Sequence, residues 1–413
     1  MPETLTPDDG LASKEPGTIA LTPGDVLERK EPLVLFAIFE PVAGLDRFQP
    51  TGFPEVGHVM YKAPRKNGAV ESVCIVDSAA SMANHLEALC MRGAHDFDLV
   101  DELQGMPYLR CVTGDLEGGH LPSARRRVVV TSLTEGHRIA STYFFGNRPK
   151  KSMKWDGKGA QRLKEDDAPA DKSFGDELAE PENFGIALDG HKKAHPPADK
   201  WWNVFKTIFR YDPNALVHGV LFPQWQIKIP RVLTAHLEAF GASRVDRSGV
   251  KFDRLGKTTS GQPIFAVDDA TAREIRATFI LDTALVRSFG RKDGDETLGL
   301  SDEQRKFLIA LALWKIQRMR EMPFRFRSGC HLSCVRLTDG AKLTDGKERE
   351  VKIDVDIQSA IKEAGFQERR ITDIYWPWDE LKRESKGDDD GDTEKDPESD
   401  SEGDGADDDE ATD

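Results

Sequence analysis

The spacing of apolar residues in the first quarter of the chain predicts two strands and a helix. A continuous apolar run, Leu33–Phe39, is the pattern of a buried strand, and Val70–Val76 predicts another. Apolar residues then recur at helical spacing over Ala79–Met91, and either Asp77 or Ser78 can cap that helix through a side-chain oxygen. A strand that leads directly into a capped helix is therefore expected early in the fold.

The clearest helical pattern lies late in the chain, over Ser301–Met322. Ser301 suits the N-cap position, and Gln304 completes a capping box three residues later. Pro and Gly punctuate Phe48–Tyr61, which predicts a loop. Weaker patterns predict a strand at Arg126–Leu133, a strand or helix at Ala277–Val286, a strand at Val351–Val355, a short helix at Gln358–Ala364 and a final apolar segment at Ile371–Trp378.

Strands and helices alternate irregularly, which favours an α+β fold over a doubly wound parallel sheet. Residues 1–32 are polar and form an expected disordered lead-in, and residues 33–386 form the body. Within the body, Gly146–Lys200 is charged, rich in Pro and poor in aliphatic residues. We therefore expect this segment to be an inserted excursion outside the core.

Net charge changes the picture once its location is considered. The whole chain carries −15, which argues against nucleic acid as a partner. Gly387–Asp413, however, holds 15 Asp and Glu against one Lys, so this segment alone carries −14. It has no aromatic or branched aliphatic residue and is expected to be disordered. The remaining body is nearly neutral, so nucleic-acid binding depends on where its basic residues gather.

Cysteine content and hydropathy limit the class of protein. Five Cys in a long chain do not predict a disulfide framework. Cys330 and Cys334 flank His331, but no second pair of ligand-type residues completes a four-ligand zinc site. The chain has neither an apolar signal core nor an apolar run of the roughly 20 residues that span a membrane. We expect a cytoplasmic protein without metal or membrane contact.

Two stretches near the N-terminus combine aromatic or small polar groups in positions suited to RNA. On the predicted loop, Gln49, Thr51 and Phe53 can stack on bases and bond to phosphate, although the aromatic residues can equally fill the core.

The start of the first predicted helix is the second such stretch. Ser81 and His85 lie near one side of the helix with Asn84 beside them, and a helix N-terminus favours phosphate. The alternative is plain capping and a solvated polar face.

Basic residues gather in two further places. Arg318–Arg336 holds five Arg and one acidic residue; if it is extended, Arg325 and Arg327 share one face, and Ser328 precedes a Gly that lets a ligand approach. Arg148–Lys164 holds seven basic residues around one Trp and can follow a nucleic-acid strand. Solvated surfaces are the alternative for both.

His137 beside Arg138 forms the last candidate pair. The two residues can supply a general base and an anion clamp, as in a ribonuclease, or they can bind RNA or have a structural role. The sequence contains no Walker loop, Rossmann glycine pattern, nucleophile elbow or HExxH motif, so no cofactor is expected.

Four of these motifs together resemble a known family. In order, they are FQPTGFPEVG, VDSAASMANHLEA, LTEGHRIAS and PFRFRSGCHL, and their combination resembles the backbone RAMP subunit of type I-U (I-G) CRISPR interference (Cascade) complexes. The resemblance covers Leu33–Leu337; Gly146–Lys200 matches poorly, and the acidic segment lies outside it.

This resemblance implies a modified RRM-like (ferredoxin-like) palm with an inserted thumb. It also implies a non-catalytic subunit that polymerises along a CRISPR RNA and presents it to target DNA, with further copies of itself, other subunits and a recruited helicase-nuclease as partners. From their chemistry and motif positions we assign RNA contacts to Gln49, Thr51, Phe53, Ser81, Asn84, His85, His137, Arg138, Arg325, Arg327 and Ser328. The alternative is a ribonuclease that trims guide precursor with His137 or His85.

Overall fold

The computed structural model describes residues 18–53, 57–145, 160–186, 196–245, 269–340, 349–366, 371–379 and 381. The acidic segment Gly387–Asp413 and residues 1–17 of the polar lead-in lie outside this range.

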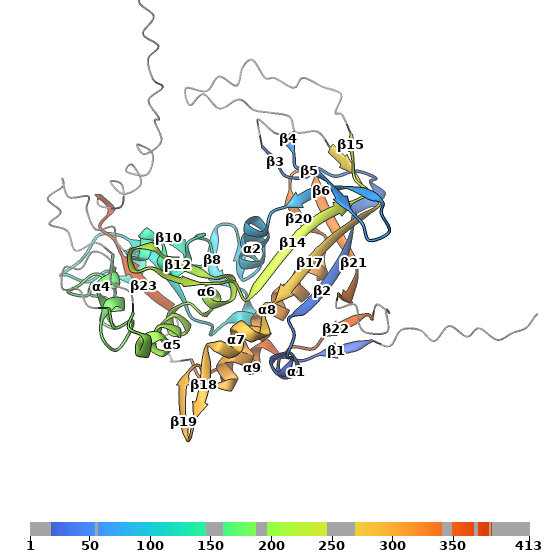
Figure 1. Cartoon of the computed structure of the whole chain (residues 1–413). Coiled ribbons are helices and arrows are strands. Elements are labelled where there is room, and N and C mark those ends of the chain that lie inside the picture. Colours follow the sequence, from blue (N-terminus) through green and yellow to red (C-terminus); the bar gives the residue numbers. More distant parts are fainter. Residues whose placement is uncertain are drawn as a thin grey trace, which may run out of the picture.

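A seven-stranded antiparallel sheet forms the centre of the described chain (Figure 1). From edge to edge its strands are β20 (Phe324–Arg327), β21 (Cys330–Asp339), β2 (Leu33–Pro41), β17 (Glu274–Leu281), β14 (Leu233–Phe240), β6 (Val70–Asp77) and β5 (Met60–Pro64). Neighbours are therefore mostly distant in sequence, and only the β20–β21 and β5–β6 pairs are sequential.

Alternating burial explains why the central strands form a two-faced sheet. In β2, Leu33, Leu35, Ala37 and Phe39 are buried, while the residues between them remain partly exposed. β14 and β17 follow the same alternation. Since side chains on a strand point to opposite faces in turn, one face of the sheet lies in the core and the other is only partly covered.

Helices pack on the sheet and form the rest of the core. α2 (Ala79–Ala88) packs against β14, and α8 (Asp302–Glu321) contacts β21, α1 (Pro23–Glu28) and α6 (Pro213–His218). Ser301 caps α8 in a capping box with Gln304, as its sequence predicts. The other described helices are α1 (Pro23–Glu28), α3 (Thr142–Phe145), α4 (Phe174–Ala179), α5 (Trp201–Tyr211), α6 (Pro213–His218), α7 (Thr283–Ser288) and α9 (Ile357–Glu363).

A second, four-stranded sheet lies beside the first, on the left in Figure 1. Its order is β10 (Arg127–Thr131), β9 (Tyr108–Thr113), β23 (Ile371–Tyr375) and β11 (Gln161–Arg162); β9 and β23 are parallel and the other pairs antiparallel. Short two-strand pairs complete the fold: β1 (Ile19–Leu21) with β22 (Val351–Ile353), β3 (Gly52–Phe53) with β4 (Gly57–His58), β7 (Met91–Gly93) with β8 (Asp96–Leu99), β12 (Val220–Phe222) with β13 (Ile227–Ile229), β15 (Ser243–Val245) with β16 (Asp269–Thr271) and β18 (Gly290–Asp293) with β19 (Glu296–Gly299).

The structure corrects the expectation that Gly146–Lys200 lies outside the core. Residues 160–186 supply β11 to the second sheet, and Phe174, Leu178 and Phe184 are buried in the main hydrophobic cluster. The apolar residues of this stretch are too widely spaced to show a helical or strand period. The prediction from sequence therefore followed the many charged residues and Pro instead. Residues 146–159 and 187–195 lie outside the described range.

The structure also corrects the expectation that residues 1–32 are disordered. Ile19–Leu21 form β1, Pro23–Glu28 form α1 with Thr22 as its cap, and Leu21, Val26 and Leu27 are buried in the core. These few apolar residues stand among polar ones, so the overall composition of the segment hid them.

Most other element predictions are confirmed, with two refinements. The predicted loop Phe48–Tyr61 contains β3, β4 and the first residues of β5. The stretch Ala277–Val286, predicted as a strand or a helix, contains the end of β17 and the start of α7. Its first part is therefore a strand and its last part a helix. The mixed α+β class is confirmed.

Candidate nucleic-acid interface

Asp77 occupies the junction between β6 and α2, where its side chain is buried. The Ser81 N–H donates to Ser78 Oγ (3.2 Å), so Ser78, and not Asp77, caps the helix. The Ser78 N–H in turn donates to Asp77 Oδ1 (2.9 Å). The Asp77 carboxylate is therefore fixed at the start of the helix with capacity for further partners.

Two side chains meet this carboxylate. His85 Nε2 lies 2.9 Å from Asp77 Oδ2, and Arg327 Nη2 lies 3.0 Å from Asp77 Oδ1. Burial on its own would raise the pKa of Asp77, but the hydrogen bond from His85 and the charge of Arg327 outweigh it and hold the pKa below its usual value. Asp77, His85 and Arg327 are called the Asp77 cluster below.

Arg327 also joins the loop after β2 to the end of β6. Its Nη1 donates to the carbonyl oxygens of Val76 (2.7 Å) and Gln49 (3.4 Å). The Gln49 N–H donates to Gly329 O (2.8 Å), and the Thr51 N–H donates to Val76 O (2.9 Å). Three of the four sequence motifs are therefore held together by one guanidinium and two backbone hydrogen bonds.

Aromatic rings fix the His85 imidazole from the side. The rings of Phe324 and Phe326 both contact it edge-on, with centroids 5.5 Å away. Phe326 is buried and also meets Phe39 of the central sheet. With Asp77 on one ring nitrogen and two Phe rings against it, His85 has little freedom to reorient, which suits a residue that positions its neighbours.

The outer surface of the cluster is polar and basic. Asn84 and Ser328 are exposed, and so is Arg325, which donates from Nη2 to Ser328 Oγ (2.9 Å). Ser81 is partly exposed, with Oγ 3.4 Å from His85 Nε2. The alternation predicted for the Arg-rich stretch is observed in part: Arg325 faces solvent and Phe326 is buried. The strand register shifts between Arg325 and Arg327, however, and Arg327 is half-buried against Asp77.

The loop residues divide between core and surface. Phe48 is buried and its backbone bridges to Ala270, so the core alternative holds for this aromatic residue. Gln49 and Thr51 are partly exposed beside the cluster. The backbone of Phe53 lies in β3, and its side chain lies outside the described part of the structure.

The geometry around His85 differs from a Ser–His–Asp relay. That relay needs the nucleophile and the carboxylate on opposite ring nitrogens. Here Asp77 and Ser81 both approach Nε2. The cluster is consequently better suited to hold loops in place than to activate Ser81.

Arg138 requires a correction, because it lies inside the protein. It is 6 % exposed and makes a bidentate pair with Glu87 of α2, from Nε to Oε1 (2.6 Å) and from Nη2 to Oε2 (2.7 Å). Nη1 donates to the carbonyl oxygens of Gly136 and Gly219 (both 3.1 Å). With its donors used internally, Arg138 is removed from the interface. His137, in contrast, is exposed, with Nδ1 2.9 Å from Glu135 Oε1.

A buried polar network continues from this pair, and sequence reasoning missed it. Asn214 donates to Glu87 Oε1 (2.6 Å) and accepts from Lys315, whose Nζ also lies 2.9 Å from His218 Nε2. Burial lowers the pKa of Lys315; burial and the Lys315 charge hold that of His218 well below its usual value. The signal in the sequence for this buried network is Lys315, which lies in the middle of the apolar run of α8.

Asp212 lies in the same interior. It accepts from the backbone N–H groups of Ile139 (3.2 Å) and Ala215 (3.3 Å). Burial raises the pKa of Asp212 to about 7, and the nearby Glu87 carboxylate adds to the rise. The buried network thereby links the motif LTEGHRIAS, which contains Arg138 and Ile139, to α2, α6 and α8.

The second basic stretch is only partly described. Arg148 and its neighbours up to residue 159 lie outside the described range. Arg162 pairs with Glu177, and Lys164 lies 3.3 Å from Asp171, so these two charges already have acidic partners.

Two kinds of feature are absent from the described residues. They contain no group of three or more His, Cys, Asp or Glu side chains arranged to hold a metal ion. None of their helices is long and apolar enough to cross a membrane.

A known protein family matches the first half of the chain. The family model described as CRISPR-associated protein GSU0053 matches residues 33–244, just over half of the 413 residues. This range contains the first three motifs, and the Arg-rich β20 lies beyond it. No curated protein matches the chain.

Proposed function

Because the chain belongs to the CRISPR-associated protein GSU0053 family, we propose that it is a non-catalytic subunit that binds CRISPR RNA in an interference complex. Copies of the subunit line up along the guide and present its bases to target DNA. Other subunits complete the complex, and a separate helicase-nuclease cuts the target.

The convergence of three motifs on the Asp77 cluster carries this proposal. Gln49, Asp77 and Arg327 come from widely separated parts of the sequence, yet they are joined by direct hydrogen bonds. The inner groups are used to hold the loops, while Asn84, Arg325 and other polar groups remain on the surface. A surface with a rigid interior and exposed basic and amide groups suits contacts to phosphate and sugar.

Such contacts fit a guide-holding role because they leave base edges free to pair. We assign phosphate contact to Arg325, with Ser328 and Asn84 as hydrogen-bonding groups beside it. Gln49, Thr51, Phe53 and Ser81 flank the strand. Arg327 and His85 act as positioning residues, because both contact the buried Asp77 carboxylate and Arg327 also donates to the Val76 carbonyl oxygen.

Strand order supports an RRM-like palm. The four central strands lie in the order β21-β2-β17-β14. In chain order, α2 precedes β14, β14 and β17 pair antiparallel, and α8 separates β17 from β21. This is the order of a β-α-β-β-α-β unit, with β5 and β6 added at one edge and β20 at the other.

Charge reversal at Arg325 tests the proposal. The Arg325→Glu variant should bind labelled guide RNA more weakly, and the slope of log affinity against log salt should fall by about one for each phosphate that the variant no longer binds. Lys292→Glu is the matched control, since Lys292 is exposed on β18 and its side chain makes no hydrogen bond or ion pair within the described residues. Equal binding by both variants would count against an interface at β20.

A ribonuclease that trims guide precursor is the second candidate, and exposed His137 favours it. Glu135 contacts Nδ1 of His137 and leaves Nε2 available to a substrate. Incubation of labelled precursor with the purified protein distinguishes the two functions. Cleavage that disappears in His137→Ala would support the ribonuclease, whereas intact precursor bound by the protein supports the guide-binding subunit.

A further inference from the structure

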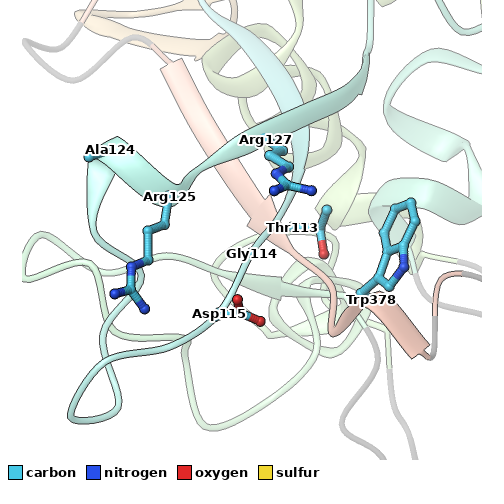
Figure 2. A pocket seen from close by; sticks show the side chains of 7 residues that line it. All are labelled: Thr113, Gly114, Asp115, Ala124, Arg125, Arg127 and Trp378. Carbon is cyan, nitrogen blue, oxygen red and sulfur yellow. The ribbon is translucent and has the colours of Figure 1, made fainter.

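A surface hollow of about 390 Å³ lies on the four-stranded sheet, and Figure 2 shows the residues that line it. It is lined by Thr113, Gly114, Asp115, Ala124, Arg125, Arg127 and Trp378. These residues come from the end of β9, the start of β10 with the turn before it, and the segment after β23. The volume is in the range of small-ligand pockets. It is called the β9–β10 hollow below.

The frame of the hollow is held by close contacts. A Cβ on Gly114 would lie 2.4 Å from Arg125 O, so only glycine permits this approach of the two loops. Tyr375 Oη donates to Gly114 O (3.3 Å), and Thr113 Oγ1 donates to Trp376 O (2.8 Å). The walls are therefore fixed by the fold in the absence of any ligand.

Two Trp residues close in sequence have opposite environments. Trp376 is fully buried, and its Nε1 donates to Tyr143 O (2.6 Å). Trp378, two residues later, is 51 % exposed on the rim of the hollow. Trp376 thus anchors the segment that displays Trp378. An anchored, half-exposed indole offers a flat apolar surface on which a base can stack.

Arg127 supplies a cation that is available to a ligand. It is exposed, and its side chain makes no hydrogen bond or ion pair with any residue in the described ranges. Arg125 already pairs with Glu117. Figure 2 shows Arg127 between Arg125 and Trp378, with Asp115 below them in the view. The hollow therefore presents an aromatic face, an exposed guanidinium and a carboxylate.

We propose that the β9–β10 hollow binds one nucleotide of a single-stranded nucleic acid. The base stacks on the indole of Trp378, the phosphate pairs with Arg127, and Asp115 accepts from a ribose hydroxyl or a base amino group. The inference rests on the proposed function for its choice of ligand, and it adds a second contact point on a different sheet from the Asp77 cluster.

An acidic peptide is the competing occupant, and the chain's own segment Gly387–Asp413 has this composition. That segment has no aromatic or branched aliphatic side chain to cover the indole. A nucleotide uses all three groups, so the chemistry favours it.

Titration of uridine monophosphate into the full-length protein, followed by ligand-observed NMR, tests the proposal, with uridine and inorganic phosphate as separate probes. Trp378→Ala should weaken uridine monophosphate binding about 5-fold or more, and Trp378→Phe should retain most of it. Arg127→Glu should reduce uridine monophosphate binding to the level of uridine. Lys292→Glu, with the same change in charge elsewhere, should leave it unchanged.

Wild-type affinity in both Trp378→Ala and Arg127→Glu would overturn the proposal. So would inorganic phosphate that binds as tightly as the nucleotide, or a Gly387–Asp413 peptide that binds at Trp378 where the nucleotide does not. These outcomes are independent of guide binding. If the hollow binds no nucleotide but the complex still carries guide RNA, the proposed function stands. If the hollow binds the nucleotide but the protein binds no guide RNA, only the proposed function is refuted.

Discussion

Replacement of Arg138 by Ala should destabilise the fold strongly while His137→Ala leaves it nearly unchanged. Arg138 and Glu87 are 6 % and 2 % exposed and share two hydrogen bonds of 2.6 and 2.7 Å. Removing one member of such a pair leaves the other charge buried without its partner, which typically costs about 3–5 kcal/mol. That loss is a large part of the roughly 5–15 kcal/mol that stabilises a typical domain.

The backbone at Arg138 reinforces this expectation. Its φ is +55°, in the left-handed region that residues with a side chain rarely adopt. Four hydrogen bonds from the guanidinium hold the residue there. Arg138→Ala keeps the backbone strain, since alanine also has a Cβ, and removes all four bonds. Arg138→Lys keeps the charge but not the bidentate geometry, so its stability should fall between those of wild type and Arg138→Ala.

Urea unfolding monitored by circular dichroism measures these differences. His137→Ala is the control: the neighbouring side chain is 80 % exposed, and surface changes usually shift stability by about 0.5 kcal/mol or less. An Arg138→Ala protein that unfolds within about 1 kcal/mol of wild type, but no longer binds RNA, would refute the internal role and return Arg138 to the interface.

Three other perturbations have defined outcomes. The pKa of Asp212 is raised from 3.8 to about 7 in the folded state, so its contribution to stability is complete below about pH 4 and is lost as the pH rises to about 7. Asp212→Asn should remove this decline in the unfolding free energy. Parallel pH profiles of the unfolding free energy for wild type and variant would contradict this expectation. Gly114→Ala should lower stability by about 1–3 kcal/mol because its Cβ would collide with Arg125 O, whereas Gly93→Ala, with open space around it, should be nearly neutral in thermal melting. Deletion of Gly387–Asp413 removes a charge of −14 and should raise binding to unrelated RNA in filter assays; unchanged binding would argue for an effect on solubility alone.

Local patterns in the sequence were sufficient for the central elements. The apolar run of β2 and the Ser301–Gln304 capping box depend on residues within a few positions of one another, so their physical causes are visible in the sequence. The same holds for the Ser78 cap of α2. Register between strands such as β2 and β21 depends on residues some 300 positions apart and has no local signature.

The site was predictable as a set of motifs but not as an arrangement. Asp77 and His85 are eight residues apart, and their strand-to-helix setting brings them together, but Arg327 joins them from 250 residues away. Arg138 illustrates the opposite case. The sequence left both RNA binding and a structural role open for Arg138, which we assigned to RNA contact, and only the fold reveals its buried pair with Glu87.

RNA recovered with the purified protein tests the central claim most directly. The protein should be produced together with its partner subunits and a guide array, isolated gently, and its bound nucleic acid sequenced and sized. The account predicts guide RNA of uniform length, bound with an affinity that falls steeply as salt is raised. Protein recovered without nucleic acid under these conditions, or with RNA unrelated to the array, would contradict it.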